Sequence, residues 1–193
     1  MDKIKLVTDG SCDLSEEVIK KFDITVVPLG VSFGEEHYTA GVDLDNKEFY
    51  AKMKESKELP KTFCPSPERF SKEFECEEDK IIVLTLSSKL SGTYNSAVLA
   101  RDLYLSENDQ KDIRIIDSET GCIGAELLLI KASKMIEEGK DIDEIVETIE
   151  GLRQKIWFYG TLETLENAIK GGRINPLAGK IIGALIFKAI VQR

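Results

Sequence analysis

The sequence has little of what a metal or redox centre requires. It contains a single histidine, His37, and its four cysteines, Cys12, Cys64, Cys76 and Cys122, form no CxxC pair. Zinc sites need clustered cysteine and histidine ligands, so no metal is expected. No glycine-rich loop of a nucleotide-binding protein is present either, and no cofactor is expected. We interpret the cysteines as reduced thiols, which are typical of a cytoplasmic protein.

Basic patches and long apolar runs are also lacking. Lysine and arginine total 26 against 35 aspartate and glutamate residues, which gives a net charge of −9. Binding to nucleic acid is disfavoured, because phosphate contacts require clustered basic side chains. The longest nearly apolar run, Ile181 to Val191, is too short to cross a bilayer, and the charged start of the chain does not resemble a signal peptide. We expect a cytoplasmic protein without a transmembrane segment.

Short apolar segments alternate with helical patterns along most of the chain. Strands are predicted at 4–8, 25–31, 81–86, 113–116 and 156–160, and helices at 15–22, 92–105, 121–138 and 143–153. A hairpin arm is expected at 37–42, and Asp45 with Glu48 resembles a capping box before a further helix. The alternation predicts an α/β fold, with a mostly parallel sheet and helices on both faces.

The pattern changes after residue 160, which predicts a domain of residues 1–160 and the beginning of a smaller second lobe at 161–193. A short helix ends at Gly171-Gly172, and Pro176 opens an apolar helix. Its apolar face comprises Ile174, Leu177, Ile181, Ile182, Leu185, Ile186 and Ile190. Because so few residues cannot close a core of their own, this face either folds back over the edge of the sheet or pairs with a second copy of the chain. We expect the second arrangement, a homodimer.

Ligands of open parallel sheets bind at the carboxyl ends of the strands, where this sequence places hydroxyl groups. Ser91, Gly92 and Thr93 follow a buried strand and open a helix, so backbone N–H groups and hydroxyls there form a candidate anion site. Asp9 follows the first strand, and Ser118 follows the strand at 113–116. Two alternatives remain open: Ser91 only caps its helix, and Asp9 orients its loop by accepting backbone N–H bonds.

Two further candidates lie elsewhere in the chain. Between Leu59 and Pro67, three prolines force an extended backbone and predict a rigid loop, in which Thr62 offers a preorganised hydroxyl. Arg173 follows two glycines and suits a phosphate or a carboxylate. The alternatives are that Thr62 is an ordinary loop threonine and that Arg173 is exposed or salt-bridged.

Five motifs, in order and spacing, resemble the DegV family, and the resemblance covers nearly the whole chain. The motifs are Thr8-Asp9 with Ser11-Cys12-Asp13-Leu14, Leu59-Pro60-Lys61-Thr62-Phe63-Cys64-Pro65-Ser66, Leu90-Ser91-Gly92-Thr93-Tyr94-Asn95-Ser96-Ala97, Asp117-Ser118 and Gly171-Gly172-Arg173-Ile174. DegV-like proteins bind fatty acids, and some are the lipid-carrying subunit of bacterial fatty acid kinase, which presents the acyl carboxylate to a separate ATP-binding subunit. Family members continue beyond the segment that resembles 183–190, so this chain is expected to end within the second lobe.

The resemblance also implies a ligand site. Thr62 and Ser91 correspond to hydroxyls that hold the fatty-acid carboxylate in the family, while the acyl tail lies in an apolar tunnel between two lobes. Arg173 belongs to a motif near the head group that engages the phosphorylated product or the kinase. The chain is therefore expected to bind a long-chain fatty acid and to have no catalytic activity of its own.

Two other functions remain open from the residues alone. An acyl hydrolase would use Ser91, Cys64 or Cys122 as its nucleophile, but nothing recognisable orients the single histidine, and Lys89 is the remaining candidate base. A phosphate-binding domain of a sugar or ketone phosphorylation system shares the anion site, although the sequence has no P-loop.

Overall fold

The computed structural model describes residues 3–56, 58–108, 110–162, 165–175 and 189–192. Its contacts divide the chain into two compact units. Unit 1 is Met1–Gly30 with Phe63–Ile156, and unit 2 is Val31–Thr62 with Trp157–Arg193. This grouping differs from the predicted division at residue 160, because most of the segment 31–62 joins a sheet and a small core separate from the parallel sheet.

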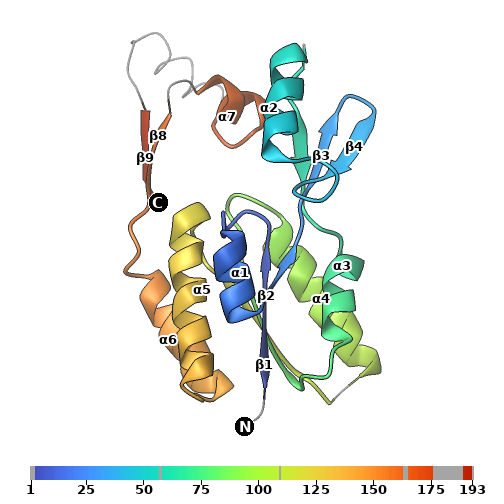
Figure 1. The fold of residues 1–193 in the computed structure, drawn as a ribbon. Coiled ribbons are helices and arrows are strands. Elements are labelled where there is room, and N and C mark those ends of the chain that lie inside the picture. Colours follow the sequence, from blue (N-terminus) through green and yellow to red (C-terminus); the bar gives the residue numbers. More distant parts are fainter. Residues whose placement is uncertain (1–2, 57, 109, 163–164, 176–188, 193) are drawn as a thin grey trace. The chain divides into compact units, whose positions relative to one another are not determined.

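Unit 1 contains a four-stranded parallel sheet (Figure 1), which confirms the predicted α/β fold. The strands are β1 (Ile4–Asp9), β2 (Ile24–Val27), β6 (Lys80–Thr85) and β7 (Asp112–Asp117), in the order β2-β1-β6-β7. Every residue of β6 after Lys80 is buried, as its apolar sequence predicts for a strand covered on both faces.

Helices cover both faces of this sheet, as predicted. One face packs against α1 (Glu16–Phe22), α5 (Cys122–Glu137) and α6 (Ile142–Arg153), and the other against α3 (Pro67–Phe74) and α4 (Thr93–Glu107). Because side chains alternate along a strand, neighbouring residues enter different cores. The first core takes Leu6, Ile82 and Leu84. The second core takes Val7, Ile81 and Val83.

Several helix ends lie where the sequence predicts them. The Ser15 hydroxyl accepts a bond of 3.2 Å from the backbone N–H of Val18 at the start of α1. Gly139, two residues past the end of α5, has φ +74°, a conformation that glycine adopts without strain. The helix α3, which is not among the helices predicted from the sequence, follows Ser66, whose side chain makes no capping hydrogen bond. Pro67 takes its first position, where the missing N–H is not needed.

A second sheet has three strands, in the order β4-β3-β5. These are β3 (Gly30–Phe33), β4 (Glu36–Thr39) and β5 (Lys61–Phe63), and they are accompanied by α2 (Asn46–Glu55). The predicted strand at 25–31 divides at Pro28 into β2 and β3, because proline cannot donate to a ladder. The proline-rich segment predicted as a loop contributes β5, so Thr62 lies on a strand.

The C-terminal part of the chain corrects two expectations. The strand predicted at 156–160 is β8 (Tyr159–Leu162), which pairs antiparallel with β9 (Ala189–Gln192) rather than joining the parallel sheet. The apolar helix predicted from Pro176 lies largely outside the described residues, and Ile190 of its apolar face belongs to β9. The short helix α7 (Glu166–Lys170) precedes Gly171. None of the helices in the described part of the chain has the length and hydropathy needed to span a bilayer.

Candidate functional site: a hydroxyl-rich sheet edge and a cationic pocket

Asp9 ends β1 at the carboxyl edge of the parallel sheet and is fully buried. Its carboxylate accepts bonds from the Ser11 backbone N–H at 3.0 Å, from the Ser11 hydroxyl at 2.5 Å and from the Leu86 backbone N–H at 2.8 Å. Burial raises the pKa of Asp9 above its ordinary value, although these bonds oppose that rise. Asp9 thus links the loops after β1 and β6, which favours the loop-orienting role over direct ligand contact.

Ser118 is also buried at this edge, in the turn after β7. Its hydroxyl donates to the Thr120 carbonyl at 3.1 Å and accepts from the Thr120 backbone N–H at 3.2 Å. The Thr120 carbonyl in turn accepts from the Ser87 backbone N–H at 2.8 Å. These bonds hold the β7 turn against the loop after β6, and the predicted contact of Ser118 with a ligand stays a prediction.

Ser91 is partly exposed in the loop between β6 and α4. The Ser91 and Thr93 hydroxyl oxygens lie 2.9 Å apart, and the Thr93 backbone N–H donates to the Ser91 hydroxyl at 3.3 Å. Thr93 itself is fully buried. The residue in the N-cap position of α4 is Gly92, not Ser91, so the buried Thr93 orients the Ser91 hydroxyl immediately before the helix.

A serine that sequence reasoning did not single out secures the proline-rich segment in unit 1. Ser96, on the first turn of α4, donates to the Pro65 carbonyl at 2.6 Å and is buried. A Cβ atom added to Gly92 would lie 3.5 Å from the Cys64 sulfur, an ordinary contact distance. The chain after β5 therefore runs beside the start of α4. The signal in the sequence was that Ser96 lies in the same motif as Ser91.

Unit 2 contains a pocket of about 940 Å³, here called the α2–α7 pocket. It is lined by Phe49, Tyr50, Met53, Glu58, Leu59, Pro60, Lys61, Thr62, Asn167, Lys170, Gly171 and Arg173. The pocket thus includes two of the predicted ligand-binding residues, Thr62 and Arg173. Thr62 lies on β5, and Arg173 donates from Nη1 to the Gly171 carbonyl at 2.6 Å.

The lining of the α2–α7 pocket suits a molecule with an anionic end and an apolar body. Phe49, Met53 and Leu59 supply apolar surface. Lys61 and Lys170 add two cations that sequence reasoning missed, and Lys170 also pairs with Glu166 one helical turn earlier. The sequence signal for these two lysines was weak, because isolated lysines are ordinary on a protein surface. Only the fold brings them together with Arg173.

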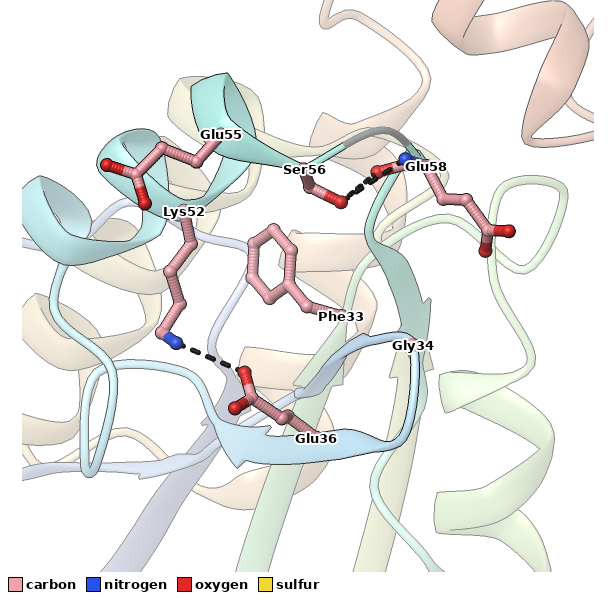
Figure 2. Close-up of a pocket in the computed structure, with 7 residues that line it drawn as sticks. All are labelled: Phe33, Gly34, Glu36, Lys52, Glu55, Ser56 and Glu58. Atoms are coloured by element: carbon pink, nitrogen blue, oxygen red, sulfur yellow. Dashed lines mark hydrogen bonds and ion pairs between the residues drawn. The ribbon is translucent and has the colours of Figure 1, made fainter.

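A smaller pocket of about 400 Å³ in unit 2 has the opposite charge character. Three glutamates, Glu36, Glu55 and Glu58, line it together with Phe33, and Figure 2 shows the Glu36 carboxylate bonded to Lys52 and the Glu58 carboxylate turned away from the Phe33 ring. The cation beside them, Lys52, bonds to Glu36 at 3.1 Å, and this bond lowers the pKa of Glu36. Glu58 lines both pockets, but the smaller one sets three glutamates against Lys52, whereas the α2–α7 pocket sets Glu58 against Lys61, Lys170 and Arg173. The α2–α7 pocket is therefore the better candidate for an anionic ligand.

The predicted site residues are therefore distributed over both units. Asp9, Ser91 and Ser118 belong to unit 1, and Thr62 and Arg173 belong to unit 2. Binding of one carboxylate by Thr62 and Ser91 together stays a prediction. Within the described residues, no group of three or more histidine, cysteine, aspartate or glutamate side chains is arranged to hold a metal ion.

These features define a two-unit α/β protein with a hydroxyl-rich carboxyl edge and a cationic, partly apolar pocket. A family model described as "Uncharacterised protein, DegV family" matches residues 3–192. The chain belongs to the DegV family. It is 41% identical over 199 residues to a DegV domain-containing protein of Clostridium acetobutylicum, covering 100% of this chain and 68% of the relative.

Solved structures agree with this assignment. A stearic-acid-binding protein from Eubacterium ventriosum is 34% identical, with a TM-score of 0.89 over 100% of this chain and 67% of that one. The fatty acid kinase B3 protein of Streptococcus pneumoniae, loaded with linoleic acid, is 27% identical, with a TM-score of 0.86 over 98% of this chain and 68% of that one. The chain thus spans about two thirds of the length of these proteins.

Proposed function

We propose that this chain binds a long-chain fatty acid. The observation that carries the proposal is its similarity, at 34% identity and over its whole length, to a protein described as binding stearic acid. The proposed head-group ligands are the hydroxyls of Thr62 and Ser91, with Gly92 and Thr93 shaping the loop and Arg173 adding positive charge. Hydroxyl and cationic donors are the groups that a carboxylate requires.

The acyl tail supplies most of the binding energy in this proposal. Burial of about 15 methylene groups at roughly 0.8 kcal/mol each amounts to about 12 kcal/mol before entropy losses. Hydrogen bonds to a charged group contribute only about 1.5–3 kcal/mol each. The affinity should therefore follow chain length, while the hydroxyls fix the position of the carboxylate.

We further propose that the protein presents the bound carboxylate to a separate ATP-binding kinase subunit in the cytoplasm and has no catalytic activity of its own. Similarity to the fatty acid kinase B3 protein supports the kinase partner. The four free cysteines suit a reducing compartment. The described hydrogen bonds of the Ser91 hydroxyl go to Thr93 rather than to a base, which disfavours the acyl hydrolase.

Lipid analysis of the purified protein tests the proposed binding. Protein expressed without added lipid is extracted, and the extract is analysed by mass spectrometry for acyl species. Delipidated protein is then titrated with palmitate while the fluorescence of Trp157, the single tryptophan, and the melting temperature are recorded. Bound saturated or mono-unsaturated fatty acids and a saturable response are expected. Absence of acyl species together with an unchanged melting temperature and fluorescence would contradict the proposal.

A further inference from the structure

Two of the four cysteines meet at the carboxyl edge of unit 1 although they are far apart in the sequence. Cys12 follows β1, and Cys122 opens α5. The backbone N–H of Cys122 donates to the carbonyl of Ser11, the neighbour of Cys12, at 3.2 Å. Covalent geometry then places the two Cα atoms less than about 7.5 Å apart. Disulfides join Cα atoms that are usually 4.4–6.8 Å apart, a range that lies within this bound.

The two thiols differ in their access to solvent. Cys12 is 1% exposed, its sulfur lies 3.0 Å from the Thr8 hydroxyl, and it belongs to the core that α5 covers. Cys122 is exposed, and its backbone has φ +46°. A reagent in solution therefore reaches Cys122 first, and the buried Cys12 is placed to react second.

The other two cysteines lie elsewhere in unit 1. Cys64 is close to Gly92 at the start of α4. Cys76 packs against the core on the opposite face of the sheet from Cys12, and its carbonyl accepts a bond from Lys111. Both thiols are half-buried. They therefore provide internal controls, of intermediate exposure, for the reactivity of the Cys12–Cys122 pair.

We propose that Cys12 and Cys122 form a reversible disulfide when the protein meets a small-molecule disulfide. The Cys122 thiolate attacks one sulfur of the reagent, forms a mixed disulfide and releases one thiolate, which takes up a proton. Cys12 then loses its proton to solvent and attacks the Cys122 sulfur, which releases the second thiol of the reagent. The protein gives up two electrons, and the reagent's S–S bond is reduced to two thiols.

The surroundings of the pair make this reaction slow at neutral pH. Burial, followed by the charge of Asp9, raises the pKa of Cys12 to about 12. Burial and the nearby Asp13 also raise the pKa of Cys122. Because the thiolate is the reacting form, the rate of disulfide formation should increase about tenfold per pH unit below these pKa values. The inference is independent of the ligand, so it stands or falls separately from fatty-acid binding.

A thiol-trapping experiment on the full chain tests the proposal. Reduced protein is incubated with a mixture of oxidised and reduced glutathione at pH 7, 8 and 9, quenched with acid, denatured, alkylated and mapped by mass spectrometry. The expected product is a peptide pair linked through Cys12 and Cys122, with Cys64 and Cys76 alkylated. Dithiothreitol should restore alkylation at all four cysteines.

Single-cysteine variants distinguish a disulfide between Cys12 and Cys122 from oxidation of the exposed Cys122 alone. Cys122→Ser should leave Cys12 reduced, because the accessible partner is gone, whereas Cys64→Ser and Cys76→Ser should form the same linked peptide as the unaltered chain. Cys122 lies on the surface, so its replacement does not threaten the fold. A lasting glutathione adduct on Cys122 with Cys12 still free, a linked peptide that includes Cys64 or Cys76, or no oxidation at any cysteine would each overturn the proposal.

Discussion

Asp9 is a side chain whose replacement should strongly destabilise the fold. Asp9→Ala leaves the backbone N–H groups of Ser11 and Leu86 without their acceptor beneath the loops. We expect the free energy of unfolding to fall by about 2–4 kcal/mol, because buried donors are costly to leave unpaired. Urea unfolding measures the loss, with the exposed Glu35→Ala as control, expected to change stability by less than about 0.5 kcal/mol. Equal stability of the two variants would show that the loops do not need this carboxylate.

The raised pKa of Asp9 also predicts a pH dependence. The folded protein binds a proton at this carboxyl at a higher pH than the unfolded chain, whose aspartate titrates near 3.8. The contribution of Asp9 to the free energy of unfolding therefore increases as the pH falls from the folded pKa toward 3.8. The difference in unfolding free energy between the unaltered chain and Asp9→Asn, followed from pH 7 to pH 4, isolates this contribution. A difference that shrinks on acidification would mean that the hydrogen bonds outweigh burial.

The hydroxyl ligands can be tested one at a time. Thr62→Ala and Ser91→Ala should each weaken fatty-acid binding by about 1.5–3 kcal/mol, the range for hydrogen bonds to a charged group. The losses should not add, since both hydroxyls would serve one carboxylate. Calorimetry measures the affinity, with Thr62→Ser expected to be mild and the exposed Ser88→Ala in the same loop as Ser91 expected to be neutral. Equal affinity of the double alanine variant and the unaltered chain would remove both residues from the site.

Sequence reasoning found the hydroxyl-rich loops but not the direction of each side chain. Asp9 and Ser118 were grouped with Ser91 because all three follow parallel strands. The structure turns the first two inward to hold the loops together and leaves Ser91 partly exposed. Such choices depend on hydrogen bonds between segments that are distant in the sequence, such as the bond from Leu86 to Asp9, and no local pattern records them.

Replacement of two helical glycines by alanine should change the stability of the protein in opposite directions. A Cβ atom added to Gly124 in α5 would lie 2.3 Å from the hydroxyl oxygen of the buried Thr120 and 3.2 Å from its Cβ atom. Gly124→Ala should therefore destabilise the protein by about 1–3 kcal/mol through overpacking, despite the better helix propensity of alanine. Gly151→Ala in α6 is the matched control, because nothing lies within 4 Å of its added Cβ.

The control has its own expected value. Gly151→Ala should stabilise the protein by about 0.5–1 kcal/mol, since alanine loses less backbone entropy in a helix. Thermal unfolding of both variants, followed by circular dichroism, shows whether each substitution raises or lowers the stability. Stabilisation by Gly124→Ala as well would mean that Thr120 moves away easily and that the start of α5 is not tightly packed.

Long helices and strands were predicted more accurately from the sequence than short ones. The long apolar strand Ile81–Leu86 and the capped helices were predicted close to their observed bounds, because periodicity and caps are local signals. β5 was missed, because three residues between prolines carry no periodicity. Its place as a strand is set by β3, its neighbour in the sheet.

The division of the molecule suggests that unit 1 does not need the first segment of unit 2. A Cβ atom added to Gly30 would overlap the ring of Phe63, so the chain leaves and re-enters unit 1 at nearly one point. We expect a variant in which a few glycines replace residues 31–62 to keep the parallel sheet. Circular dichroism and a cooperative thermal transition measure this, with the full chain as reference. A molten or insoluble product would show that both segments fold together.

The predicted division at residue 160 assumed that a domain is continuous in the sequence. The contacts instead group the segments on either side of an insertion, and this return of the chain depends on pairings that a linear pattern cannot display. Self-association through the apolar residues after Ile174 stays a prediction, and sedimentation at micromolar concentration tests it.

The strand order β2-β1-β6-β7 also affects how the protein is made. β1 ends at Asp9, but β6, which pairs with it along one whole side, begins only at Lys80. At translation rates of 5–20 residues per second, β1 waits roughly 4–15 seconds for this partner. During that time the residues that become the centre of the sheet, such as Leu6 and Val7, have an unpaired edge on the ribosome. We therefore expect the nascent chain to gain from chaperones that shield apolar strands until β6 has emerged.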